Sequence, residues 1–239
     1  MRKGNIFLGL TVLFIGVIFF PQPYAAKGIQ TEAKLTASDP TTDGQFGVAL
    51  AVDGDTAVIG APAASGNSPM TGAVYVFERS GDTWIQTAKL IAKDGEAKDL
   101  FGRAVAIHGS TIAVGAPSDD EAGWNVGAVY IFTRNGNKWV ETDKLLPGTV
   151  GDIYFGFTVS LNGDRLAIGA PYTNSGATNS GAAYVFETAA GGWREVVRLA
   201  TGGGGAVLSD LFGWSVALRN DLLVVGAYLN DAAYVYQYN

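Results

Sequence analysis

Apolar segments recur along this chain at a regular interval, and each copy contains four short stretches with the character of β-strands. The first stretch follows a Phe-Gly pair, the second ends at Gly-Ala, the third is of the type Tyr-Val-Phe, and the fourth closes on a basic residue and Leu. In the second stretch, for example 56–59 or 222–225, apolar residues follow one another without polar alternation, which indicates a strand buried on both faces. The pattern predicts an all-β protein.

The landmark residues of the repeat keep their relative positions from copy to copy. The Phe of the Phe-Gly pair stands at Phe46, Phe101, Phe155 and Phe212. Gly-Ala follows fourteen residues later in all four copies, and the first three copies also share Trp84, Trp139 and Trp193. A repeat of about 55 residues with constant internal spacing predicts tandem structural units. We expect the three tryptophans to pack in the core between units.

Turn signals separate the first two strands of each unit. They stand at Asp53-Gly54, His108-Gly109, Asn162-Gly163 and Arg219-Asn220, and such pairs favour a two-residue hairpin. Four-stranded sheets that are buried on both faces are typical of the radially stacked blades of a β-propeller. We therefore predict a β-propeller of four four-stranded blades, with repeats that start near residues 46, 101, 155 and 212.

The phase of the repeat suggests how such a ring closes. Residues 31–35 match a fourth strand, whereas the last copy reaches Asn239 soon after its third strand. We expect residues 31–36 to pair with residues 232–237 and to complete the last blade, because this pairing covers an exposed sheet edge. The alternatives are a fragment of a larger ring and an open stack that needs a partner.

The N-terminal segment has the features of a signal peptide over residues 1–26. Two basic residues precede an apolar run over residues 6–20, and Pro21 follows that run. The alternative is an uncleaved anchor, but this run is shorter than the roughly 20 residues needed to span a bilayer. We expect a mature domain over residues 27–239 with no membrane span, either secreted or held in the periplasm or at the cell surface.

Charge and composition exclude several function classes. The net charge is −6, whereas nucleic-acid binding normally requires a basic face. The chain has no Cys, so disulfides, thiolate catalysis and Cys-ligated zinc are excluded. His108 is the single His, and its place at a turn favours a structural role over that of a catalytic base.

The landmark residues resemble the FG-GAP repeats of integrin α-subunit propellers and of exported microbial proteins, over residues 31–239. The resemblance implies a β-propeller with a role in extracellular recognition or adhesion. Members that bind calcium do so through an Asp-rich loop between the first two strands. Here that turn is too short for Asp53, Asp55 or Asp164 to surround an ion, so we expect no cofactor and no metal site of this kind.

Acidic residues gather in the loops that leave the second strands and enter the first strands, which lie on one face of a propeller. These loops span residues 36–45, 61–71, 92–100, 116–126, 146–154, 170–180, 200–211 and 227–230. They carry only two lysines but ten acidic residues, namely Asp39, Asp43, Asp94, Glu96, Asp99, Asp119, Asp120, Glu121, Asp152 and Asp210. A negative face attracts cations or a basic partner, although Asp also favours turns for purely structural reasons.

We predict a non-catalytic binding or adhesion scaffold whose loop face recognises a protein or a cell-surface or matrix ligand, with a basic ligand as one candidate. The candidate contact residues are Asp94, Asp99, Asp119, Asp120, Glu121 and Trp124. One alternative is a metal-assisted hydrolase-type enzyme with a site at the propeller centre, formed by Asp39, Asp94 and Asp99. Another is a purely structural surface protein that assembles with other copies.

Overall fold

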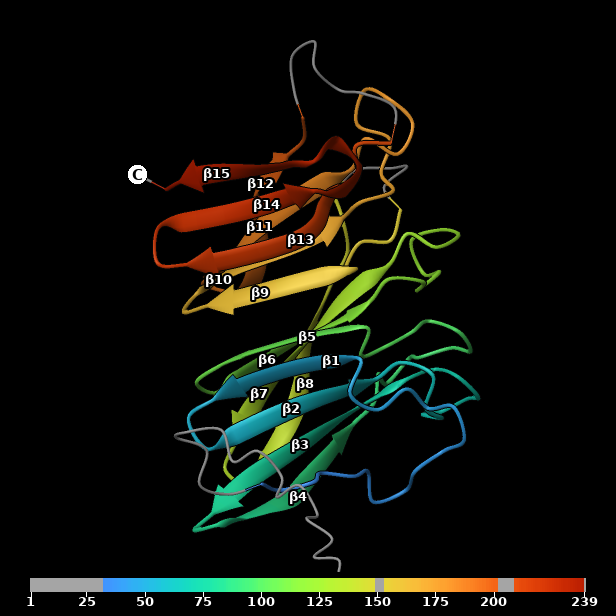
Figure 1. Cartoon of the computed structure of the whole chain (residues 1–239), viewed down its shortest axis with the longest axis vertical. Helices are drawn as coiled ribbons and strands as arrows, with labels where there is room; N and C mark the ends of the chain where they lie inside the picture. The colour runs from blue at the N-terminus through green and yellow to red at the C-terminus, as the bar shows by residue number, and fades with distance from the viewer. Residues whose placement is uncertain (1–31, 149–152, 202–208, 239) are drawn as a thin grey trace, which may run out of the picture. The chain divides into compact units, whose positions relative to one another are not determined.

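Four antiparallel sheets, one for each copy of the repeat, make up the part of the chain that this computed structural model describes (Figure 1). The described residues are 32–148, 153–201 and 209–238. The predicted signal peptide at residues 1–26, together with residues 27–31 and Asp152, lies outside them. Within each sheet the strands follow chain order, each pairing with the next through a hairpin. This confirms the all-β prediction.

We call the four sheets blades 1 to 4. Blade 1 consists of β1 (Ala49–Asp53), β2 (Thr56–Ala61), β3 (Ala73–Ser80) and β4 (Thr83–Leu90). Blade 2 consists of β5 (Ala104–His108), β6 (Thr111–Ala116), β7 (Ala128–Asn135) and β8 (Lys138–Leu145). Blade 3 consists of β9 (Thr158–Asn162), β10 (Arg165–Ala170), β11 (Ala182–Ala189) and β12 (Gly192–Leu199). Blade 4 consists of β13 (Phe212–Arg219), β14 (Leu222–Ala227) and β15 (Ala232–Gln237), with the short 3-10 helix η1 (Tyr228–Asn230) before β15.

The first hairpin of every blade has a two-residue turn, but this turn begins one residue later than predicted. Asp53 still pairs with Thr56 and is therefore the last residue of β1, and the turn is formed by Gly54 and Asp55. His108, Asn162 and Arg219 end the first strands of the other blades in the same way. The residue after each of them has a positive φ, and Asn220 adopts φ 54° where the other blades have Gly. Asn tolerates this conformation better than most residues do.

The repeated Phe fills the centre of each blade contact. The Phe101 ring meets Tyr130 edge-on at 5.4 Å and Phe132 at 5.9 Å between ring centroids. Equivalent rings meet in the other three blades. Phe101, like its two later counterparts, is fully buried. The predicted core tryptophans are half-buried and pack against the same apolar clusters.

The repeated Gly of Gly-Ala allows consecutive blades to approach backbone to backbone. A Cβ on Gly60 would lie 2.0 Å from the carbonyl oxygen of Gly102 in the next blade. The same clash would occur between Gly115 and Gly156 and between Gly169 and Gly213. First strands also contact in succession, β1 with β5, β5 with β9, and β9 with β13. The repeated glycines therefore reflect contacts between blades, in addition to strand pairing within each blade.

The N-terminal segment does not take the position that the repeat phase predicts. Blade 4 has three strands among the described residues, and residues 32–37 form no strand. Instead, Leu35 and Ala37 pack into the apolar cluster of blade 1 with Phe46 and Tyr75. Burial of these apolar side chains stabilises the segment there. Pairing with β15 would instead form hydrogen bonds with backbone groups of an edge strand that water can also bind. The predicted pairing of residues 31–36 with residues 232–237, and ring closure through it, is not confirmed.

Among the described residues, no helix has the length and apolar character that crossing a bilayer requires.

Candidate functional site

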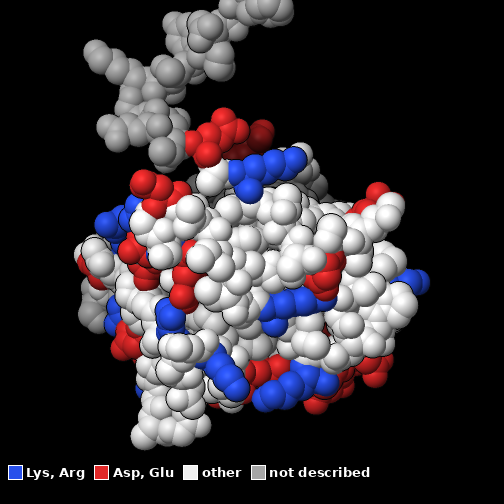
Figure 2. Space-filling model, turned by 90° about the horizontal axis from the view of Figure 1, so that it is seen from below, with Lys and Arg blue, Asp and Glu red and all other residues white. Residues whose placement is uncertain are grey.

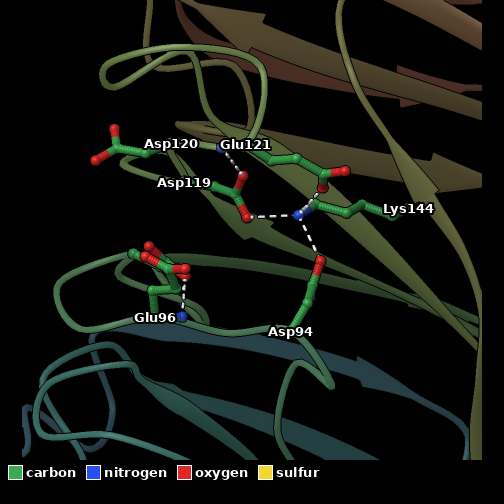
Figure 3. A pocket seen from close by; sticks show the side chains of 7 residues that line it. Asp94, Glu96, Asp119, Asp120, Glu121 and Lys144 are labelled. Atoms are coloured by element: carbon green, nitrogen blue, oxygen red, sulfur yellow. Dashed lines mark hydrogen bonds and ion pairs between the residues drawn. The ribbon is translucent and has the colours of Figure 1, made fainter.

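An acidic pocket lies between two loops of blade 2 (Figure 3). One loop joins β4 to β5 and the other joins β6 to β7, so strand ends of two consecutive blades fix their positions. The cavity has a volume of about 270 Å³ and is lined by Asp94, Glu96, Asp99, Asp119, Asp120, Glu121 and Lys144. Six carboxyl groups therefore share one cavity with a single lysine.

Lys144, on β8, is the central cation of the pocket (Figure 3). Its Nζ atom lies 2.7 Å from Asp94 Oδ2, 2.9 Å from Asp119 Oδ2 and 2.5 Å from Glu121 Oε2. Burial lowers the pKa of Lys144, but hydrogen bonds to these three carboxylates outweigh it, and the net pKa is raised. Lys144 therefore stays charged, and it ties the two loops together.

Tyr130, on β7, forms the floor of the same cluster. Its hydroxyl oxygen lies 2.9 Å from Asp94 Oδ1 and 2.7 Å from Asp119 Oδ2, and its one proton is donated to either carboxylate in turn. Burial raises the pKa of Asp94, but hydrogen bonds from Lys144 and Tyr130 outweigh burial and lower it overall. Burial followed by the Asp119 carboxylate raises the pKa of Tyr130 well above its usual range, so the hydroxyl remains a donor.

Asp99 is a buried carboxyl group of the pocket with a raised pKa. Only 4% of it is exposed, and its Oδ2 accepts a 2.6 Å hydrogen bond from the backbone N–H of Glu96. Burial is the main cause that raises its pKa to about 6; the Glu96 N–H opposes this rise, and the charges of Asp119 and Glu96 add to it. The negative charge of the pocket therefore changes close to neutral pH.

Part of this arrangement recurs in blade 1 and is therefore structural. There the Lys89 Nζ lies 2.7 Å from Asp39 Oδ2, and the Tyr75 hydroxyl donates to Asp39 at 3.0 Å. This tie repeats the one between Lys144, Asp94 and Tyr130, and in blades 1 and 2 it anchors the segment that enters the blade. Blade 2 adds Asp119 and Glu121, whose slots in blade 1 are held by Ala64 and Gly66. The added carboxylates distinguish the pocket from the repeated framework.

The structure brings together five of the six predicted contact residues, which are Asp94, Asp99, Asp119, Asp120 and Glu121. Asp120 points away from Lys144 (Figure 3). Its Oδ1 accepts a hydrogen bond from the backbone N–H of Asn125. Trp124 shares the β6–β7 loop but does not line the cavity, and it is 81% exposed.

Two further acidic loop residues that the structure describes, Asp39 and Asp210, have other partners and do not line this pocket. Asp39 is held by Lys89 and Tyr75 in blade 1, and the buried Asp210 accepts a hydrogen bond from the Thr201 hydroxyl. In the part of the chain that the structure describes, no group of three or more acidic or His side chains is placed to hold a metal ion. Asp39, Asp94 and Asp99, the set named for a metal-assisted enzyme, belong to two separate clusters.

Lys144 and Tyr130 were missed as pocket residues. Both stand at repeated positions, the basic residue before Leu and the Tyr of the third strand, and were therefore read as framework. The recurrence of a basic residue at Lys89, Lys144 and Arg198 was a usable signal, because a buried cation requires acidic partners in nearby loops.

The face seen in Figure 2, at the end where β4 lies in Figure 1, carries basic and acidic side chains interspersed among uncharged ones. The pocket of blade 2 instead gathers six carboxyl groups around one lysine. It gives an acidic cavity beside an exposed Trp, which can attract and hold a cationic group.

Comparison with known proteins matches the repeat and the fold. A family model described as FG-GAP repeat matches residues 30–77, 84–132, 139–186 and 193–236. No curated protein matches the chain. Among solved structures, the computationally designed Ika4 protein is similar with a TM-score of 0.51, at 13% sequence identity over 87% of this chain and 100% of that one. At this identity the likeness concerns the fold alone.

Proposed function

Since the chain belongs to the FG-GAP repeat family, we propose that it is a non-catalytic binding scaffold whose acidic pocket in blade 2 recognises a basic group of a protein or cell-surface ligand. The observation that carries the proposal is the composition of the pocket, six carboxyl groups against Lys144 alone. A lysine or arginine side chain of a partner is the complement of such a cavity.

The position of the pocket supports a binding role. Its acidic side chains come from two loops, and each loop is anchored at both ends by strands of packed blades. Loops on a rigid scaffold are where binding residues concentrate. Asp120 and Glu121 are exposed at the rim, whereas Asp119 and Asp99 are buried beneath them. Such layering places accessible charges over a fixed base.

The groups inside the pocket favour binding over catalysis. Lys144, Tyr130 and Asp119 are engaged with one another, and no Ser, Thr, Cys or His stands among the residues that line the described cavity. A nucleophile with an adjacent base is the usual arrangement of a hydrolytic site. We therefore propose recognition without a chemical step.

The proposal is tested with peptides of defined charge. We expect hexalysine and hexaarginine to bind the protein at low ionic strength, to bind weakly at ~0.5 M salt because charges are screened, and hexaglutamate not to bind. Isothermal titration calorimetry gives the affinity, and quenching of Trp124 fluorescence reports binding near the β6–β7 loop.

Variants locate the site. Replacing Asp120 by Asn together with Glu121 by Gln should weaken hexalysine about three- to tenfold, since each exposed charge pair contributes up to about 1 kcal/mol. Asp82→Asn, an exposed acidic residue in the turn between β3 and β4, is the matched control and should bind like the parent protein. Equal affinity of the two variants, or absence of hexalysine binding to the parent protein, would contradict the proposal.

We also propose export, with residues 1–26 as signal peptide. The apolar run behind two basic residues supports this. N-terminal sequencing of protein recovered outside the cytoplasm should begin near Lys27. Recovery of the intact N-terminus in the cytoplasmic fraction would contradict export.

A further inference from the structure

The two end blades leave apolar sheet faces uncovered that are covered in the middle of the chain. The front face of a blade is the one that packs on the preceding blade, and its back face packs on the next one. Val105 and Ile107 lie on the front face of blade 2 and are each 8% exposed, because they pack on Val58, Val74 and other residues of the back face of blade 1.

The front face of blade 1 has no such cover. Leu50 and Val52 hold the repeat positions of Val105 and Ile107, but they are 70% and 68% exposed. Val48 extends the same face and is 48% exposed. In blade 3 the corresponding residues, Val159 and Leu161, are again buried. The exposure of Leu50 and Val52 therefore follows from the absence of a neighbouring sheet and not from their side-chain type.

The back face of blade 4 is the complementary case. Val235 of β15 is 67% exposed, whereas the residues at its position in the other blades, Val76, Ile131 and Val185, are fully buried. Leu222 lies on the same face and is 45% exposed. The outward residues of β15 besides Val235 are the uncharged Ala233 and Gln237, and the one charged residue beside Leu222 on this face is Arg219 of β13, directly opposite it. Exposed apolar sheet faces of this kind mark interaction sites.

Two glycines at positions that form backbone contacts between blades elsewhere in the chain have no neighbouring blade here. Gly226 is the Gly of Gly-Ala in blade 4, but no atom of another blade lies near the place of its Cβ. Gly47 belongs to the Phe-Gly pair of blade 1, and nothing lies within 4 Å of the place of its Cβ, whereas a Cβ on Gly102 would lie 2.6 Å from the Ala73 carbonyl oxygen. Gly226 could contact the backbone of a following blade, and Gly47 that of a preceding blade, but neither blade is present in the single chain.

We infer that these two faces bind each other between copies of the chain, with the front face of blade 1 in one copy stacked on the back face of blade 4 in a second copy. The contact continues the one already made between blades 1 and 2, 2 and 3, and 3 and 4. Because the two surfaces differ, the contact is heterologous, and each copy has one of each. Two copies then satisfy both faces reciprocally, or further copies extend the stack.

The N-terminal segment occupies the position that this contact requires. Asp39 binds Tyr75 and Lys89 of blade 1 as Asp94 binds Tyr130 and Lys144 of blade 2. The residues just before Asp94 belong to β4, the fourth strand of the preceding blade. Leu35 therefore arrives where the fourth strand of a preceding blade would end. In the proposed assembly that preceding blade is blade 4 of the second copy, whose β15 is an edge strand.

One corner of the contact differs from the internal ones. Gly72 of blade 1 pairs with Phe101 of the next blade, whereas blade 4 has Asp231, with φ 48°, at that position after the 3-10 helix η1. A side chain there does not allow the same backbone bridge. The proposed contact therefore rests on the strand faces and on Gly226.

Site-specific crosslinking tests the inference, and a chain without Cys makes the labelling unambiguous. Val52→Cys and Val235→Cys are made as separate variants, mixed, and treated with a bismaleimide. We expect a crosslinked product of two chains in the mixture. Val140→Cys, on β8 and 40% exposed, replaces Val235→Cys in the control mixture and should give none.

The other outcomes overturn the inference. A product of two chains within either single variant alone would mean that like faces meet. A crosslink inside one chain in the double variant, without products of two chains, would mean that the same chain closes on itself.

Sedimentation velocity gives an independent test. The parent protein should sediment as a dimer or larger species, and Leu50→Lys or Val235→Lys should each shift it to the monomer. Val140→Lys should not. Both substituted positions are exposed in the single chain, and an unchanged thermal melting curve verifies that the variants are folded. A parent protein that remains monomeric at all concentrations would overturn the inference.

Discussion

Asp119 Oδ2 lies 2.9 Å from Lys144 Nζ, and the side chains of the two residues are 4% and 16% exposed, respectively. Because Asp119 is buried, removal of the lysine leaves a carboxylate whose remaining charge-compensating partners are weak. We expect Lys144→Gln to lower the free energy of unfolding by about 2–3 kcal/mol, measured by urea denaturation.

Lys89→Gln is the matched control for this prediction. Its partner Asp39 lies at the same 2.7 Å that separates Asp94 from Lys144, but the Asp39 side chain is 51% exposed. We expect a loss below about 1 kcal/mol, as is usual for exposed ion pairs. Equal losses in the two variants would show that burial of Asp119 does not matter.

Asp99 makes the stability of the domain depend on pH. Its pKa is raised to about 6 in the folded chain, mainly by burial, and is about 4 when unfolded. The folded state therefore binds this proton more tightly, and its contribution to stability is complete below about pH 4 and lost as the pH rises through about 6. Asp99→Asn should then be more stable than the parent protein at about pH 7, by at most about 3 kcal/mol, and similar to it at about pH 4.

Urea denaturation of both proteins across that pH range measures the difference. The difference should grow between about pH 4 and 7 and stay constant above that range. A difference that does not vary with pH would show that Asp99 has an ordinary pKa.

The backbone contact between blades predicts a large effect of a single methyl group. A Cβ on Gly115 would lie 2.0 Å from the Gly156 carbonyl oxygen, and neither backbone can move alone. We expect Gly115→Ala to cost about 2–4 kcal/mol. Gly136→Ala is the control, since Gly136 has φ 61° with open space around it and should cost about 1 kcal/mol through backbone strain alone. Similar losses at the two sites, measured by thermal melting and urea denaturation, would contradict the contact.

The repeated Phe should matter more inside the stack than at its end. Phe101 is fully buried between blades 1 and 2, whereas Phe46 is half-buried. In a chain kept monomeric by Leu50→Lys, we expect Phe101→Ala to cost about 3–5 kcal/mol and Phe46→Ala about half as much, measured by urea denaturation. In the parent protein, where the proposed contact between copies covers blade 1, the loss for Phe46→Ala should be larger than in the Leu50→Lys background. Equal losses for Phe46→Ala in the two backgrounds would contradict the contact between copies.

Much of the fold was predictable because hairpins are local. The Phe-Gly, Gly-Ala and Tyr-Val-Phe landmarks fixed the number of blades, and the family match confirms them. The place of residues 32–37 was not predictable in this way. A sequence of the fourth-strand type indicates only that the segment can pair with the edge of a sheet. The burial of Leu35 and Ala37 against blade 1 depends on surfaces formed by residues that are distant along the chain.

The site was predictable in its carboxylates and not in its cation. Acidic residues gather in the loops of one predicted face, and this pattern led to five of the carboxylates that line the pocket. Lys144 and Tyr130 conformed to the repeat, and their role in the pocket depends on Asp119, which only the second copy has. Lys144 and Tyr130 thus keep the residue types of the repeat, and their additional partner comes from the acidic residue at position 119. Trp124 was named because it departs from the repeat, but it lies outside the cavity.

Among the described residues, the first strands contact in succession, β1 with β5, β5 with β9 and β9 with β13, so the blades form a series of similar junctions. A gene that encodes such a protein can gain or lose one whole unit by tandem duplication or deletion, and the junction formed is chemically the same as those already present. The glycine and phenylalanine landmarks would then persist because they form the packing contact between any two successive units, whichever copies these are.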